Sequence, residues 1–239
     1  MCDLCSVNAT KLSRRGLLLG GAALAGMSMT APTVAWSQTA TPQNAISPDA
    51  ALERLMEGNA RYAANTSANN DYSAGRAARV NAQYPIAAIL SCADARVAPE
   101  LAFDQGPGDL FVVRVAGNFL NDDGLASFEY AVKYLNTPLL MVLGHSNCGA
   151  VGATIKVIQD GVTLPGHLQD MIRDIKPAVE TAEKAKPADL LSASIAENVR
   201  LAAHRLETAS PILSEYVSSG KVKVVGAQYD LATGKIALL

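Results

Sequence analysis

Residues 139–148 read LLMVLGHSNC, an unbroken apolar run that ends in Gly-His, with a cysteine three residues further on. A second apolar run, IAAILS over residues 86–91, ends directly at another cysteine. Continuous apolar runs that alternate with helical patterns are typical of strands buried on both faces of a parallel sheet. The sequence therefore predicts an α/β fold, with a mainly parallel β-sheet flanked by helices.

The remaining elements follow from the same kinds of pattern. Ser47-Pro48-Asp49 combines a cap residue, a first-turn proline and an acid, which predicts the start of an extended N-terminal helix. This helix is expected to run to about residue 64. Further strands are expected at 110–115, 222–227 and 235–238, and helices at 124–135 and through most of 150–219.

The composition indicates one globular domain without a nucleic-acid partner. The chain has 239 residues, of which 49% are hydrophobic, and a formal net charge of −2. It lacks the basic stripe with interleaved aromatic residues that is typical of nucleic-acid-binding proteins. Four cysteines in a chain of this length do not make a disulfide scaffold. Cys2 and Cys5 form a CxxC pair at the extreme N-terminus, ahead of an export signal.

That signal begins with Arg14-Arg15, which precede a Gly/Ala/Leu-rich stretch as in twin-arginine signal peptides. The stretch is weakly hydrophobic for a membrane span, so we expect cleavage, and Cys2 and Cys5 would leave with the signal. An uncleaved membrane anchor is the alternative. We therefore expect a protein exported by the twin-arginine machinery, periplasmic, with no stable membrane span in the mature chain. The expected parts are a signal peptide over 1–35 with cleavage near 35–40, a linker over 36–46 and a catalytic domain over 47–239.

Cys92, His145 and Cys148 form a candidate metal site. Ligands of parallel α/β sheets gather at the carboxyl ends of the strands, where both sequence blocks lie. Two thiolates and one imidazole can bind zinc, and three protein ligands leave the fourth position open to water, as in catalytic zinc sites. Because a lone buried cysteine is usually an inert small hydrophobe, the hypothesis rests on the combination.

Asp94 and Arg96 follow Cys92 closely enough to reach the same cavity. Zinc lowers the pKa of bound water, and a carboxylate can orient the resulting zinc-bound hydroxide by accepting its hydrogen bond. Asp94 can also bind the metal and close the site. A forked, charge-assisted pair with Arg96 would hold Asp94 in the first role. An ordinary surface ion pair is the alternative reading of these two residues.

Taken together, the sequence resembles the β-class carbonic anhydrases. The matching segments are CADAR, FVVRVAGN, FEYAV, VLGHSNCGAV, ENVRLAAHRL and VVGAQYDLATG, in the family's order, from about residue 46 to the C-terminus. The resemblance implies a zinc lyase, carbonate dehydratase, that hydrates carbon dioxide reversibly to bicarbonate and a proton. It also implies one zinc per chain and a homodimer or tetramer. The implied site has Cys92, His145 and Cys148 as zinc ligands and Asp94 and Arg96 as the catalytic dyad.

The resemblance further implies a substrate pocket. Gln83, Phe111 and Tyr130 fall at the family's pocket positions, which come partly from the neighbouring subunit. Gln83 would donate a hydrogen bond to bicarbonate, and Phe111 would form an apolar wall for carbon dioxide. The backbone N–H of Gly149 would bind a substrate oxygen. Gln83 also indicates the constitutively open type of enzyme rather than the bicarbonate-regulated type.

Three other functions remain open on the sequence alone. A relative with the same site could hydrolyse carbon disulfide or carbonyl sulfide. A non-enzymatic zinc module, such as a bicarbonate sensor, would explain the metal ligands but has no need of Asp94 and Arg96. A thiol redox protein that uses Cys92 and Cys148 would bind no metal and would form an exchangeable disulfide.

Overall fold

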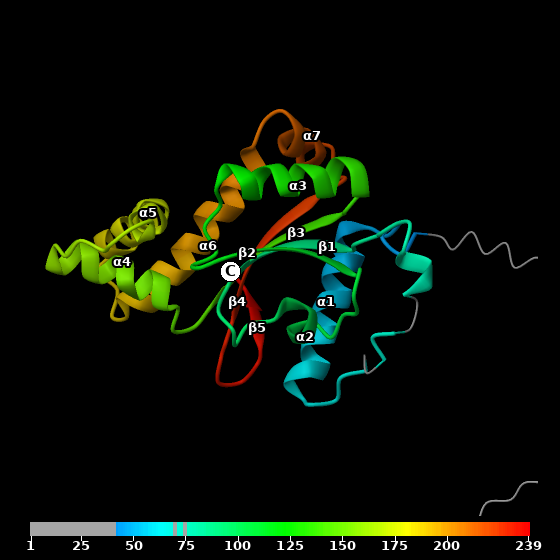
Figure 1. Ribbon diagram of the computed structural model, residues 1–239, viewed down its shortest axis with the longest axis horizontal. Helices are drawn as coiled ribbons and strands as arrows, with labels where there is room; N and C mark the ends of the chain where they lie inside the picture. Colours follow the sequence, from blue (N-terminus) through cyan, green and yellow to red (C-terminus); the bar gives the residue numbers. More distant parts are fainter. Residues whose placement is uncertain (1–41, 69–70, 74–75) are drawn as a thin grey trace, which may run out of the picture. The chain divides into compact units, whose positions relative to one another are not determined.

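Figure 1 shows the computed structural model, which describes residues 42–68, 71–73 and 76–239. The predicted signal peptide over 1–35 lies outside the described residues, as does the predicted linker before residue 42. Within the described ranges, no helix combines the length and the apolar character that a membrane crossing requires.

A five-stranded sheet in the order β2-β1-β3-β4-β5 forms the centre of the fold (Figure 1). The first four strands are parallel and β5 is antiparallel to β4, which confirms the mainly parallel sheet. Cys92 and His145 are the last residues of neighbouring strands, one and two residues beyond the ends expected from the apolar runs. The strands are β1 (Ala87–Cys92), β2 (Leu110–Val115), β3 (Leu139–His145), β4 (Lys223–Tyr229) and β5 (Ile236–Leu238).

Seven α-helices accompany the sheet in the described part of the chain; α1 precedes the first strand and the other six connect strands. The span 150–219, expected to be mostly helical, is divided among four of them, and the four-residue α2 is too short to show a periodic pattern. They are α1 (Pro48–Ala63), α2 (Pro99–Ala102), α3 (Asp122–Leu135), α4 (Gly149–Asp160), α5 (Leu168–Lys184), α6 (Leu190–Thr208) and α7 (Ile212–Ser218). A 3₁₀-helix, Ala77–Arg79, lies in the segment between α1 and β1.

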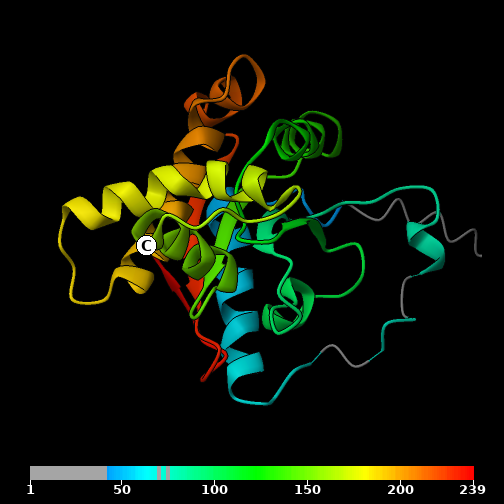
Figure 2. The ribbon, with the colours of Figure 1, turned by 60° about the vertical axis from the view of Figure 1, so that its left-hand side comes forward.

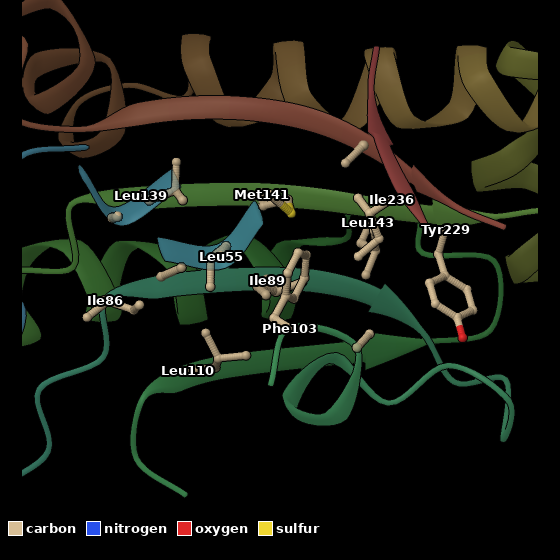
Figure 3. Close-up of a cluster of buried hydrophobic side chains, with 14 of the residues drawn as sticks. Leu55, Ile86, Ile89, Phe103, Leu110, Leu139, Met141, Leu143, Tyr229 and Ile236 are labelled. Atoms are coloured by element: carbon tan, nitrogen blue, oxygen red, sulfur yellow. The ribbon is translucent and has the colours of Figure 1, made fainter. Parts of the chain in front are cut away.

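Helices cover both faces of the sheet, which explains why the inner strands β1 and β3 are buried along their whole length. Ile89 and Met141 face α1 and pack with Leu55 in the cluster shown in Figure 3. Their neighbours Leu90 and Val142 face the opposite side and pack against α3, α6 and α7 (Figure 1). Each of these five side chains is fully buried, which stabilises the fold by about 1.5–3 kcal/mol per side chain.

Side-chain caps fix the starts of α1 and α3, as one does for α6. The Ser47 hydroxyl accepts a hydrogen bond from the N–H of Ala50 at 3.1 Å, so α1 begins where the sequence predicts. The Asn121 side chain accepts one from the N–H of Gly124 at 2.9 Å. Because this cap is followed by two acids in the first turn, α3 begins at Asp122, two residues before the expected start.

Helices α4, α5 and α6 pack together beside the carboxyl ends of the strands (Figure 2). Their apolar side chains enclose two cysteines in a third cluster, in which Cys92 and Cys148 lie with Val151, Ile175 and Ile195. This packing keeps water away from one side of the candidate metal site.

Candidate metal centre

Cys92, His145 and Cys148 come together at the carboxyl edge of the sheet. Cys92 ends β1, His145 ends the adjacent β3, and Cys148 is the residue before α4. All three are buried, and their ligand atoms lie within 4.8 Å of one another. Ligand atoms at about 2.0–2.3 Å from one tetrahedral zinc ion lie roughly 3.3–3.8 Å from each other, somewhat closer than this upper limit. The three side chains therefore fit around one ion with little adjustment.

The His145 imidazole is arranged as a metal ligand. Its Nδ1 lies 2.9 Å from the carbonyl oxygen of Ser146, so Nδ1 carries the proton and donates it to that carbonyl. Its Nε2 is then a free acceptor, and in the structure this atom is buried without a hydrogen-bond partner. A buried polar atom without a partner costs free energy, and a metal ion at this position would satisfy it. The donor set thus fits a bound zinc ion.

The loop that carries His145 is itself tied to the β4–β5 connection. The N–H of Ser146 donates to the carbonyl of Tyr229 at 2.9 Å, and the Ser146 hydroxyl accepts from the N–H of Leu231 at 2.9 Å. Because Ser146 is held at both its backbone and its side chain, its carbonyl keeps the imidazole ring in one orientation.

The two cysteines shift each other's pKa in opposite directions. A hydrogen bond from the Cys148 thiol lowers the pKa of Cys92 well below its usual range, and the backbone N–H of Gly117, 3.2 Å from Sγ, contributes to the same shift. The Cys92 thiolate in turn raises the pKa of Cys148. Thiolates are the form in which cysteine binds metals, so a divalent cation would displace the Cys148 thiol proton.

Asp94 and Arg96 form a forked ion pair beside this cluster. Arg96 Nε lies 2.9 Å from Oδ1 and Arg96 Nη2 lies 2.7 Å from Oδ2, while the Arg96 N–H adds a third bond to Oδ1 at 2.9 Å. These bonds hold the pKa of Asp94 well below its usual range, so the carboxylate is anionic at neutral pH. Asp94 Oδ2 lies 3.8 Å from His145 Nε2, which places it next to the metal position.

Gly149 is the first residue of α4 and follows the ligand Cys148. It is exposed, and a Cβ added to it would meet no atom within 4 Å. The backbone beside the cysteine is therefore open on that side. This space agrees with the prediction that a substrate oxygen approaches the Gly149 N–H, which stays a prediction.

The structure gathers Gln83, Phe111 and Tyr130 elsewhere in the chain. The rings of Phe111 and Tyr130 have centroids 6.4 Å apart, and Gln83 and Tyr130 line a cavity of about 700 Å³ whose lining includes none of the metal-site residues. In the β1–β2 register Phe111 lies opposite Ala88, four residues before Cys92. At about 3.3 Å per residue this is roughly 13 Å along the strand. Within one chain, Phe111 therefore does not face the metal centre.

Sequence reasoning missed the residues that hold the site's loops in place. Arg114 binds backbone carbonyls of the turn after Cys92. Asn198 of α6 is buried and donates to the carbonyl of Gly117 at 2.8 Å. Both lie in segments that match the family pattern, but their contacts are with backbone atoms. Neither has a chemical signature that the sequence could reveal.

Comparisons with known proteins agree with this site. The chain matches the family model described as carbonic anhydrase over residues 87–236. Carbonic anhydrase 2 of Mycobacterium tuberculosis is 39% identical over 198 residues, which cover 80% of this chain and 92% of that protein. The carbonic anhydrase of Mycolicibacterium smegmatis is 36% identical over 192 residues, with 80% and 93% covered.

A solved structure, the Coccomyxa β-carbonic anhydrase in complex with acetazolamide, superposes with a TM-score of 0.61 at 28% identity. The match covers 79% of this chain and 86% of that one. Fold, buried donor set and sequence similarity over most of the chain thus point the same way, and the protein belongs to the carbonic anhydrase family, in its β class.

Proposed function

We propose that this protein is a zinc enzyme that hydrates carbon dioxide reversibly to bicarbonate and a proton. The observation that carries the proposal is the placement of an anionic carboxylate, Asp94, 3.8 Å from the free Nε2 of a buried Cys/His/Cys cluster. A structural zinc site is closed by four ligands and has no use for such a group. Relatives named carbonic anhydrase, at 36–39% identity over 80% of the chain, support the same reaction.

Bound zinc would supply a nucleophile at neutral pH, because it lowers the pKa of coordinated water. Asp94 then accepts a hydrogen bond from the attacking oxygen and fixes its orientation. The fork to Arg96 keeps the carboxylate anionic and prevents it from turning into the metal position. The Gly149 N–H, at the positive end of α4, is suited to a developing negative charge on the substrate oxygen.

The first test is carbon dioxide hydration by the purified protein, with zinc content measured on the same sample. About one zinc per chain and catalysed hydration would support the proposal. Zinc without hydration would contradict it, and a panel with carbon disulfide and carbonyl sulfide would then identify a hydrolase. Absence of zinc together with a Cys92–Cys148 disulfide would instead favour a thiol redox protein.

We predict that Asp94→Asn lowers the rate of hydration by about 100- to 1,000-fold while zinc stays bound, because the orienting acceptor is lost and no ligand is removed. The measurement is stopped-flow hydration with zinc content. Asp170→Asn is a matched control, since Asp170 also pairs with an arginine, Arg173, at 2.7 Å, on the exposed side of α5. A wild-type rate in Asp94→Asn with full zinc would refute the orienting role.

We also propose that the protein works as a homodimer or a larger homo-oligomer with shared active sites. Support comes from Gln83, Phe111 and Tyr130, which lie together but away from the metal cluster of their own chain. Exposed Tyr134 stacks beside Tyr130 with ring centroids 5.5 Å apart, which adds apolar surface for a partner to cover. In such an oligomer, the pocket residues of one protomer serve the metal centre of its partner.

Complementation tests this arrangement. His145→Asn removes a metal ligand and Gln83→Ala removes a pocket residue, and each variant alone is expected to be impaired. When the two chains are co-expressed, a mixed dimer with shared sites contains one site with both residues intact. Activity above the sum of the separate variants is therefore expected. Strict additivity would show that each chain builds its own pocket.

We further propose export in folded form through the twin-arginine machinery to the periplasm. Support comes from Arg14-Arg15 and the Gly/Ala/Leu-rich stretch that follows. Folding before export would also allow Cys92 and Cys148 to bind zinc in a reducing compartment. Replacement of both arginines by lysine should leave active, unprocessed protein in the cytoplasm, as fractionation would show. Wild-type amounts of processed protein in the periplasm would contradict the proposal.

A further inference from the structure

Arg114 is bound to the backbone of the turn that carries the catalytic pair. Its Nε donates to the carbonyl oxygen of Cys92 at 3.0 Å. Its Nη2 donates to the carbonyl oxygens of Asp94 and Val97, each at 2.8 Å. A single guanidinium group thus connects the start, the middle and the end of the Cys92–Val97 turn.

The three backbone carbonyls are the hydrogen-bond partners of the Arg114 guanidinium group. Among the described residues, Arg114 has no carboxylate partner within salt-bridge distance, whereas Arg96 is paired with Asp94. Arg114 lies on β2, an edge strand of the sheet, and its side chain connects this edge to the turn. An arginine offers several N–H groups in one rigid plane, while a lysine offers a single nitrogen. The geometry therefore requires the guanidinium, not merely a positive charge.

Without Arg114 the turn would keep a few separate hydrogen bonds in the described structure, among them the one from the Arg96 N–H to Asp94 Oδ1 at 2.9 Å. The N–H of Ala93 donates to the carbonyl of Val115 at 3.0 Å, and the N–H of Val97 donates to the carbonyl of Asp94 at 3.0 Å. These bonds keep the chain close to β2 and close the turn on itself. The Asp94 backbone N–H adds a contact to Cys92, but Arg114 is the side chain that joins the Cys92, Asp94 and Val97 carbonyls through one group.

We propose that Arg114 is a positioning residue for hydration, which fixes the Cys92–Val97 turn and thereby the place of the Asp94 carboxylate beside the metal position. The inference rests on the proposed hydration function. A displacement of about 1 Å in a catalytic group can lower a rate by about 100-fold. Cys92 is less affected, because it is the last residue of β1 and also receives the Gly117 N–H at its sulfur.

The test compares Arg114→Lys, Arg114→Gln and the matched control Arg200→Lys. Arg200 is a half-exposed helix residue whose ion pair with Glu197 spans 3.7 Å, so its replacement should change nothing. In both Arg114 variants we expect kcat to fall by about 10- to 100-fold, with KM and zinc content unchanged, because the orientation of the nucleophile is altered and substrate binding is not. Wild-type kcat in Arg114→Lys with a loss in Arg114→Gln would overturn the proposal, since charge alone would then suffice.

Amide hydrogen exchange gives a readout that does not depend on activity. Exchange in peptides that cover residues 93–97 should be faster in both Arg114 variants than in wild type, with and without added zinc. Exchange in the β1 residues 87–91 should stay the same. Wild-type exchange in the turn would overturn the proposal. If the wild-type enzyme showed no hydration at all, the proposed function would fail, while this measurement would still test whether Arg114 fixes the Cys92–Val97 turn.

Discussion

Replacement of His145 by asparagine should remove zinc from the protein and lower hydration by more than about 100-fold. Loss of groups that merely bond to metal ligands costs about 10- to 100-fold, so loss of a ligand should exceed this range. Asparagine is the most specific substitution because its amide nitrogen can replace Nδ1. It can keep the hydrogen bond to the Ser146 carbonyl, which spans 2.9 Å from Nδ1 in the structure. The change therefore deletes the Nε2 donor and little else.

The chain provides a matched control in His204→Asn. His204 lies on α6 with 72% of its side chain exposed, and its nearest charged partner is Glu207 at 3.9 Å. Zinc content and hydration should stay at the wild-type level in this variant. Metal analysis and stopped-flow rates on both proteins complete the experiment. Full zinc and full activity in His145→Asn would show that the imidazole is not a ligand.

Much of the metal centre could be predicted from sequence because its residues stand where local rules are strong. Cys92 and His145 end apolar runs of about six residues, and parallel strands present such ends at one edge. Both strands extend slightly further than the apolar residues, because backbone pairing continues through Cys92 opposite Val115 and His145 opposite Tyr229. Polar ligands thus belong to the strands themselves.

The helical region shows where local patterns reach their limit. Residues 150–219 are rich in helix formers throughout, so the sequence suggested helices without their boundaries. Two of the three breaks occur where Gly161 takes a left-handed conformation with φ 64° and where Asp189 caps α6 by accepting from the N–H of Ser192 at 3.0 Å. Each signal is a single residue, which is weak evidence until the packing of α4, α5 and α6 is known.

The residues that stabilise the site could not be identified from sequence for a different reason. Arg114, Ser146 and Asn198 act through backbone carbonyl and amide groups, which every residue carries. Their partners are far away in sequence or depend on the exact course of a loop. Phe111 presents the same difficulty, since its register in the sheet shows that it does not reach the metal centre of its own chain.

Gly117 offers the second large effect, because its substitution should destabilise the fold next to the metal site. Its backbone has φ +83°, and an added Cβ would lie 2.5 Å from Ile175 Cδ1 and 3.0 Å from Ala150 Cβ. Strain in this conformation and overpacking together should lower the free energy of unfolding of Gly117→Ala by about 2–4 kcal/mol. For a chain of this size that corresponds to a decrease in Tm of roughly 5–15 °C.

Gly152→Ala is the control for this experiment. Gly152 lies within α4, and a Cβ there would meet only Leu191 Cδ1 at 3.9 Å, an ordinary contact. Since alanine is the better helix former, this variant should keep the wild-type Tm or raise it. The free energy of unfolding should rise by at most about 1 kcal/mol. A similar loss in both variants would mean that glycine replacement near the site is harmful in general, and the specific account of Gly117 would fail.

A double mutant separates steric overlap from backbone strain. Ile175→Val removes the Cδ1 atom that the new methyl group would meet, and alone it should cost about 0.5–1.5 kcal/mol. In the Gly117→Ala background the same change relieves the overlap, so its cost should vanish or reverse, with a coupling energy of about 1 kcal/mol or more. Strain at φ +83° and the contact with Ala150 would remain, so wild-type stability is not regained. If Ile175→Val costs the same in both backgrounds, the overlap with Ile175 is not the source of the instability. Strain at φ +83° together with the contact with Ala150 Cβ must then account for it.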